Sequence, residues 1–69
     1  MELVGLKKAR KERRLSQLQL AMELSISREA ISYYENGQRS PDVGMLLKMA
    51  RYFNVSVDYL ITGEEFSPR

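Results

Sequence analysis

The chain has 69 residues, 43% of them hydrophobic, and a formal net charge of +2, which suits one small domain with one core. It contains no cysteine and no histidine, so a disulfide framework, a thiolate zinc site and the commonest metal ligand and general base are all missing. We therefore expect neither an enzyme nor a metal or cofactor site. No apolar run approaches the roughly 18 residues of a membrane span, and no secretory signal is recognisable, so a cytoplasmic location is expected.

The first predicted helix covers residues 3–14, with Leu6 and Ala9 turned inward. Gly5 lies near its start and weakens the helical prediction there. Six of the eleven basic residues fall within the first fourteen positions. Such a charge run is most often a solvated face, so on its own it does not decide whether a polyanion binds there.

A helix–turn–helix follows in residues 16–36. Ser16 precedes Gln19 by three residues, which is the spacing of a reciprocal capping box, and it begins the second helix. Ser27 is placed to cap a third helix over residues 28–36, which Gly37 ends. Only a tight turn fits between the two helices.

The fourth predicted helix follows the loop "QRSPD". Asp42 is the preferred cap, and Ser40 followed by Pro41 is the alternative start. An apolar stripe with i, i+3, i+4, i+7 spacing is formed by Leu46, Met49, Ala50 and Phe53. The stripe is interpreted as plain core.

The chain ends with a short fifth helix and a tail. Asn54 closes the fourth helix, Ser56 caps the fifth through Ile61, and Gly63 ends it. We assign residues 1–63 to one domain and residues 64–69 to a short flexible tail. The fold class is all-α, a compact five-helix domain.

On a helical wheel the third helix has two distinct sides. Ala30, Ile31 and Tyr34 cluster on the side that can pack on the second helix. The opposite side carries Arg28, Glu29, Ser32, Tyr33 and Asn36. These hydrogen-bonding groups suit base edges in a DNA major groove, which is about 12 Å wide and admits one helix. Any surface helix has a polar side, so it is the paired, capped helices that strengthen this interpretation.

The stretch "SQLQLAMELSISREAISYYENGQRSP" resembles the helix-turn-helix of the lambda-repressor and Cro-like (XRE-type) family of bacterial and phage transcription regulators. The resemblance extends over residues 3–63 and includes "VSVDYLITG". It implies a compact five-helix domain. It also implies a bacterial or phage-derived protein that is associated with the nucleoid.

The resemblance also implies residue roles. Gln17 corresponds to a glutamine that bonds a DNA phosphate, and Asn36 and the following loop, with Arg39, fall where the family grips the backbone. Arg10 and Glu35 match an ion pair between the first and third helices. The positions that fall on the base-reading surface are Arg28, Glu29, Ser32 and Tyr33, with Ser27 at its edge. The sequence leaves open whether Tyr33 contacts a thymine methyl or a phosphate.

Three positions depart from the family pattern. Ser25 replaces the usual glycine between the motif helices and must take or avoid a left-handed conformation at some cost. Gln38 stands where a basic residue is common, so more of the phosphate contact falls to Arg39. Gly44 lies in the first turn of the fourth helix, where a better helix former is usual.

The function expected from these features is sequence-specific binding of double-stranded DNA by a transcriptional regulator, more specifically a repressor. It would bind as a homodimer, with half-sites about one helical turn, roughly 34 Å, apart. Val55, Val57 and Leu60 are expected to complete the core, which leaves Tyr59, Ile61 and Phe66 for the partner subunit. The alternative is an antitoxin-type or other protein-interaction module on the same fold, using that same apolar surface.

Overall fold

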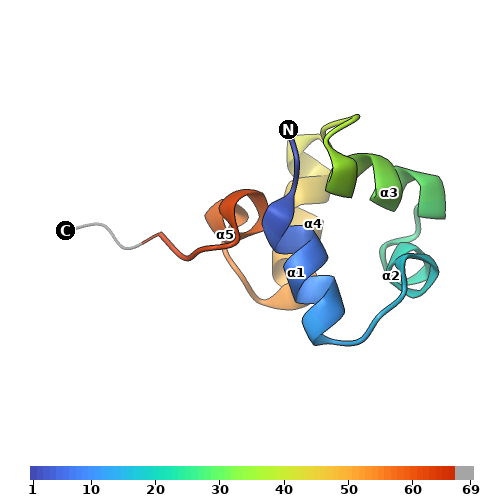
Figure 1. The fold of residues 1–69 in the computed structure, drawn as a ribbon, viewed down its shortest axis with the longest axis horizontal. Helices are drawn as coiled ribbons and strands as arrows, with labels where there is room; N and C mark the ends of the chain where they lie inside the picture. The colour runs from blue at the N-terminus through green and yellow to red at the C-terminus, as the bar shows by residue number, and fades with distance from the viewer. Residues whose placement is uncertain (67–69) are drawn as a thin grey trace.

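The structure, a computed structural model, describes residues 1–66, which form five helices and no strand (Figure 1). In chain order the helices are α1 (Val4–Glu12), α2 (Gln17–Leu24), α3 (Arg28–Asn36), α4 (Val43–Phe53) and α5 (Val57–Thr62). Helix α1 occupies the middle of the domain, α5 lies on one side of it, and α2 and α3 lie on the other. The all-α, five-helix prediction is confirmed.

Four helices begin at a side-chain cap, which explains where they start. The hydroxyls of Ser16, Ser27 and Ser56 accept hydrogen bonds from the amides three residues on, at 3.0, 3.1 and 3.0 Å. Asp42 caps α4 in the same way, with its Oδ1 2.8 Å from the Met45 amide. The predicted caps are confirmed, and the alternative start of α4 at Ser40 is wrong. The preference follows from the amide groups that a helix N-terminus leaves unpaired.

Helix α1 begins one residue later and ends two residues earlier than predicted, and residues 13 and 14 belong to the connection to α2. The chain leaves the helix after Glu12, and Arg14 adopts a left-handed φ of 56°. Arg13 donates from its guanidinium to the carbonyl oxygens of Tyr52 and Phe53, at 3.2 and 3.3 Å. This side chain therefore satisfies orphan carbonyls at the end of α4. The predicted boundary at residue 14 is corrected to residue 12.

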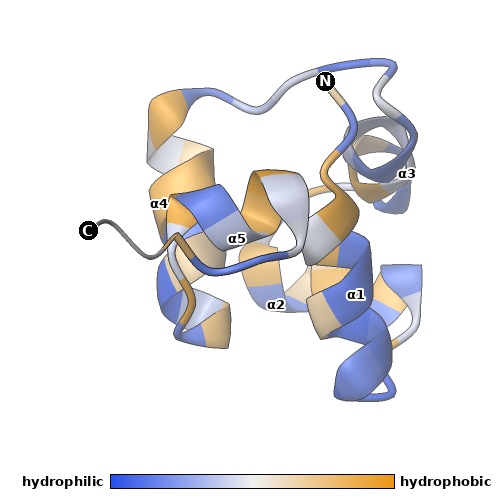
Figure 2. Ribbon diagram, turned by 60° about the vertical axis from the view of Figure 1, so that its left-hand side comes forward, coloured by the Kyte–Doolittle hydropathy of each residue, from blue (hydrophilic) through white to orange (hydrophobic). Residues whose placement is uncertain are grey.

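Every helix contributes at least one fully buried side chain to the core. Its largest fully buried members are Leu3, Leu6, Leu20, Leu24, Ile31, Met49 and Leu60. Figure 2, coloured by hydropathy, shows mostly apolar residues along α4 and a hydrophilic C-terminal end of α1. Among residues 1–66 no helix has the length and apolar character needed to cross a bilayer.

Gly5 is required by the packing of α5 on α1. A Cβ atom built on Gly5 would lie 1.6 Å from the backbone oxygen of Tyr59 and 2.9 Å from the Cα of Leu60. Backbone atoms cannot move aside as a side-chain end can, so no larger residue fits. The sequence alone indicated only that Gly5 weakens the start of α1, and its role in this close approach was missed.

Ser25 adopts the left-handed conformation, with φ 57° and ψ 41°. The turn is closed because the amides of Ser25 and Ile26 donate to carbonyl oxygens of the last turn of α2, Met22 and Ala21, at 3.3 and 3.0 Å. A side chain at such a position costs about 1–2 kcal/mol relative to glycine. The turn of the helix-turn-helix is thus built with a strained residue.

Replacing Ser25 by glycine should therefore stabilise the fold. We expect the Ser25→Gly variant to gain about 0.5–1 kcal/mol, since the relieved strain exceeds the extra entropy of the unfolded chain. Thermal unfolding should then shift upward by a few degrees. The matched control is Ser40→Gly, because Ser40 has no positive φ and the same substitution should there lower stability. A melting temperature that falls in both variants would contradict this reading of the turn.

Candidate nucleic-acid interface

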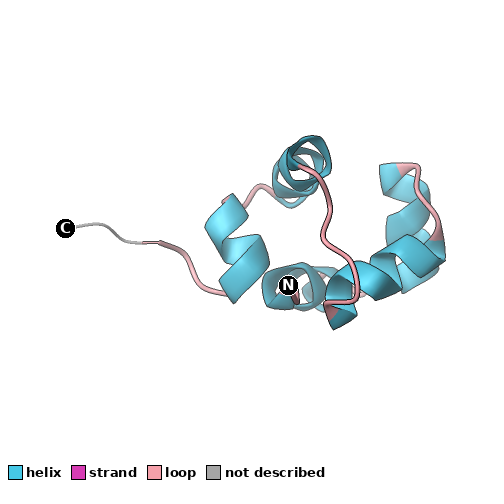
Figure 3. Ribbon diagram, turned by 90° about the horizontal axis from the view of Figure 1, so that it is seen from above, coloured by secondary structure: helices cyan, strands magenta, loops and turns pink. Residues whose placement is uncertain are grey.

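The second and third helices lie at the end of the molecule opposite α5, as two views agree (Figures 1 and 3). The inner side of α3 carries Ile31, which is fully buried, and Tyr34, which packs against the core. Ala30 was also expected on that side but is only half-buried. The packing of α3 therefore leaves its other side available to a partner.

The outward side of α3 is polar and accessible along its length. Arg28, Glu29 and Asn36 are exposed, while Ser32 and Tyr33 are half-buried. Asn36 donates to the hydroxyl of Ser32 at 3.3 Å, one turn earlier on the same side. This arrangement provides hydrogen-bond donors and acceptors over about two turns of one helix, which is the length that a major groove can accommodate.

A buried carboxylate joins the first three helices beneath this surface. Glu35, 3% exposed, accepts hydrogen bonds from Nε and Nη2 of Arg10 at 2.6 and 3.1 Å. The remaining guanidinium nitrogen, Nη1, donates to the Leu15 carbonyl at 2.9 Å. Both charges are thus paired and hydrogen-bonded, which burial of charged groups requires. The two residues expected to pair between α1 and α3 do so in the structure.

The same carboxylate also holds Gln17, at the start of α2. Its Nε2 donates to Oε1 of Glu35 at 3.1 Å, and its Oε1 accepts from Nη1 of Arg28 at 3.4 Å. A continuous chain of contacts therefore connects the buried ion pair with an exposed side chain of α3. The residue expected to bond a phosphate and the residue expected to read a base are neighbours in space.

A prediction about stability follows from this pair. Arg10→Met and Glu35→Leu should each destabilise the fold by about 3 kcal/mol, because each leaves one buried charge without its partner. The double variant should recover part of the loss, since neither charge then remains. Chemical denaturation of the four proteins measures both effects.

Arg51→Met is the control, because Arg51 is exposed at the end of α4, and it should stay near the wild-type value. If the two single losses simply add in the double variant, Arg10 and Glu35 are not coupled.

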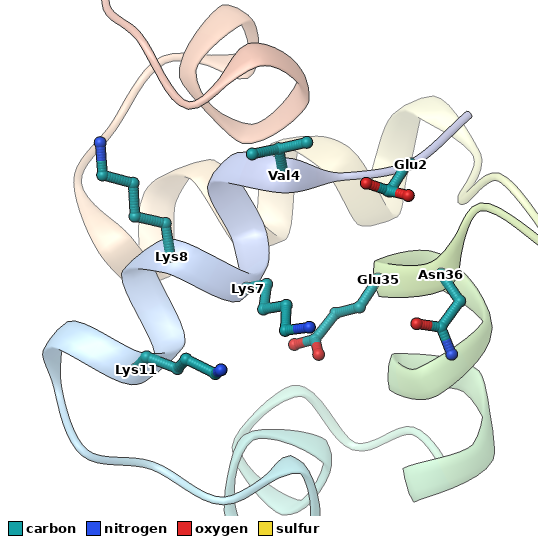
Figure 4. A pocket seen from close by; sticks show the side chains of 7 residues that line it. All are labelled: Glu2, Val4, Lys7, Lys8, Lys11, Glu35 and Asn36. Carbon is teal, nitrogen blue, oxygen red and sulfur yellow. The ribbon is translucent and has the colours of Figure 1, made fainter.

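Two lysines beside this network were not among the expected site residues. A hollow of about 350 Å³ lies between α1 and the end of α3 (Figure 4). Lys7 and Lys11 project into it, toward Glu35 and Asn36, whereas Lys8 points away and donates to the Gly63 carbonyl at 3.3 Å. The i, i+4 spacing of Lys7 and Lys11 on α1 was the available signal, because it places both on one side of the helix.

The three apolar residues expected to form a dimer surface differ in burial. Tyr59 and Ile61 are half-buried and pack against the core of their own chain, while Phe66 is 66% exposed. The hydroxyl of Tyr59 donates to Glu12 at 3.1 Å, and desolvation and the Glu12 carboxylate raise the pKa of Tyr59 above its ordinary value. The expectation that all three are surplus to the core is corrected, since Tyr59 and Ile61 take part in the core of their own chain. Their place in a dimer contact stays a prediction.

Comparison with known proteins decides the family. A helix-turn-helix family model matches residues 6–60. The chain belongs to this family. Among its relatives in Bacillus subtilis are the helix-turn-helix-type transcriptional regulators YqaE, 44% identical over 60 residues, and ImmR, 39% identical over 64 residues. The alignments cover 87% and 93% of this chain but 52% and 50% of the relatives, so the chain spans about half the length of both.

A solved structure extends the comparison to the fold. The P22 c2 repressor, in a complex with a synthetic operator, superposes with a TM-score of 0.78 at 29% sequence identity. The superposition covers 93% of this helix-turn-helix chain and all of the repressor chain in that structure. The helix-turn-helix chain therefore has the lambda-repressor-like fold, as its residues 16–36 predicted.

Proposed function

We propose that this helix-turn-helix chain is a sequence-specific DNA-binding regulator that inserts the outward side of α3 into the major groove. The observation that carries the proposal is the contact chain from the buried Glu35 through Gln17 to Arg28. These contacts hold Gln17, which we expect to bond a phosphate, next to Arg28, which we expect to contact a base. The P22 c2 repressor, which shares the fold, is seen with an operator.

The roles within the interface follow from the chemistry of each side chain. Arg28 lies at the start of α3, where its forked guanidinium can donate two hydrogen bonds to a guanine edge. Glu29 can accept from a cytosine amino group and repels phosphates, so it serves discrimination rather than affinity. Ser32, one turn on from Arg28 and Glu29, belongs to the same reading surface, and Ser27 lies at its edge with its hydroxyl already used as the α3 cap.

Backbone contacts come from groups around the edge of α3. We assign this role to Gln17, Asn36 and Arg39, and add Lys7 and Lys11, whose side chains project from α1 into the hollow that Glu35 and Asn36 also line. Such contacts fix the position of a protein on the duplex without reading sequence. By occupying its site the chain would exclude other proteins, so the regulator acts as a repressor in this proposal.

Arg28 should support sequence-specific binding of DNA, whereas Arg39 should support binding that does not depend on sequence. Arg28→Ala should cost about 1–3 kcal/mol on a duplex selected from a random pool and relax the preference at one base position. Arg39→Ala should weaken all sequences alike and make the salt dependence shallower by about one unit. Titrations of labelled duplexes over a series of salt concentrations separate the two effects.

The matched control is Arg51→Ala, which removes an exposed arginine at the end of α4. Affinity and base preference that both survive Arg28→Ala would refute α3 as the reading helix. Contacts with DNA phosphates release counterions, so binding through them must weaken as salt rises. Binding by the chain that does not weaken with salt would instead favour a protein-interaction module, because apolar contacts release no counterions.

We further propose that the chain binds DNA as a homodimer whose contact includes Phe66. This side chain is 66% exposed just after α5, whereas Tyr59 and Ile61 contribute only the parts that their own core leaves uncovered. An exposed aromatic ring is a common anchor of protein interfaces. Two copies would place two α3 helices on half-sites about one helical turn apart.

Replacing Phe66 by serine tests the dimer without disturbing the core. Sedimentation equilibrium should show a dimer for the wild type and a lower mass for Phe66→Ser at the same concentration. Met22→Ser is the control, because Met22 is similarly exposed, at 71%, but lies on α2. An identical mass for the wild type and Phe66→Ser would exclude Phe66 from any self-association.

A further inference from the structure

The turn that follows α3 is anchored on Tyr33 through the backbone. The carbonyl oxygen of Tyr33 accepts a hydrogen bond from the amide of Gly37, which caps the helix. It also accepts hydrogen bonds from the amides of Gln38 and Arg39, at 2.9 and 3.4 Å. Gly37 adopts a positive φ of 78°, which turns the chain back over the end of the helix. The backbone of Arg39 is therefore held at a fixed position relative to Tyr33.

The two side chains are also in contact. The Cζ of Arg39 lies 4.9 Å from the centroid of the Tyr33 ring, within the range of a cation–π interaction. Within residues 1–66 the Arg39 guanidinium forms no ion pair and no side-chain hydrogen bond. A guanidinium above a ring keeps the N–H groups at its edges available. The contact thus orients the cation without using its donors.

We propose that Tyr33 is a positioning residue whose aromatic ring holds Arg39 ready for a DNA phosphate. The proposal rests on the proposed function and deepens it, because it removes Tyr33 from the base-reading set. The reading surface then consists of residues in the first half of α3, near Arg28. Tyr33, in the second half, supports the backbone-binding edge instead.

The physical benefit is pre-organisation. Arginine has one of the largest side-chain entropies to lose when it is immobilised. A side chain that already lies on a ring in the free protein loses less of that entropy on binding, so its phosphate contact is stronger. The ring itself is sequence-neutral. Its loss should therefore weaken every duplex to the same degree.

A measurement on the free protein tests the contact directly. Ring currents should move the NMR signals of the Arg39 δ-methylene protons upfield from their random-coil positions. Tyr33→Phe keeps the ring and should keep this shift, whereas Tyr33→Leu should abolish it. Random-coil positions in the wild type would overturn the proposal without any reference to DNA.

Binding measurements test its consequence. Tyr33→Leu should lower affinity about two- to fivefold, the range expected for an exposed cation–π contact, equally for preferred and random duplexes. Tyr33→Phe should bind like the wild type. In an Arg39→Ala background Tyr33→Leu should have no further effect, because the cation that it positions is gone.

Contrary outcomes are distinguishable from failure of the proposed function. A base preference that changes at one position in Tyr33→Leu would make Tyr33 a base reader and overturn the proposal. Equal losses for Tyr33→Leu with and without Arg39 would overturn it as well. If the wild type binds no duplex at all, the proposed function fails and the proposal with it, although the ring-current shift would still be present.

Discussion

The buried carboxylate of Glu35 is the interaction on which the arrangement of the first three helices depends. It accepts two hydrogen bonds from Arg10 of α1 and one from Gln17 of α2, while it belongs to α3 itself. A charge that is 3% exposed would be very costly without these partners. Its position therefore requires that α1 and the start of α2 meet the end of α3 in one geometry. A directional network can specify this more narrowly than apolar packing alone.

That geometry has consequences at the surface. Because the Nε2 of the half-buried Gln17 is held by Glu35, its Oε1 is presented to the exposed Arg28 side chain. At the other end of α3, Tyr33 holds Arg39 through a backbone carbonyl and an aromatic ring. Both ends of the proposed interface are thus ordered before a partner arrives. Pre-organisation of this kind lowers the entropy cost of binding and favours one register on the duplex.

Much of this could be predicted from the sequence. The Arg10–Glu35 pair was implied only by the family resemblance, whereas the correctly predicted helix starts share a physical cause. Caps at Ser16, Ser27, Asp42 and Ser56 are local, because a side chain bonds an amide three residues away. The failures depend on distant partners. Arg13 lies just after α1 and donates to carbonyl oxygens at the end of α4, and Gly5 is needed because the backbone of α5 packs closely against it. Tyr59 and Ile61 were judged surplus to the core for the same reason: their core contacts could not be seen before α5 was placed on α1.

The most direct test of the account is an NMR titration of the ¹⁵N-labelled chain with a duplex selected from a random pool. The account predicts the largest shift changes at Gln17, at the amides of residues 28–33 and at the Arg28 and Arg39 side-chain nitrogens. Resonances of α5 should change little, or only as the chain dimerises. Saturable binding in which residues 28–33 remain unperturbed, while α5 or α4 responds, would contradict it.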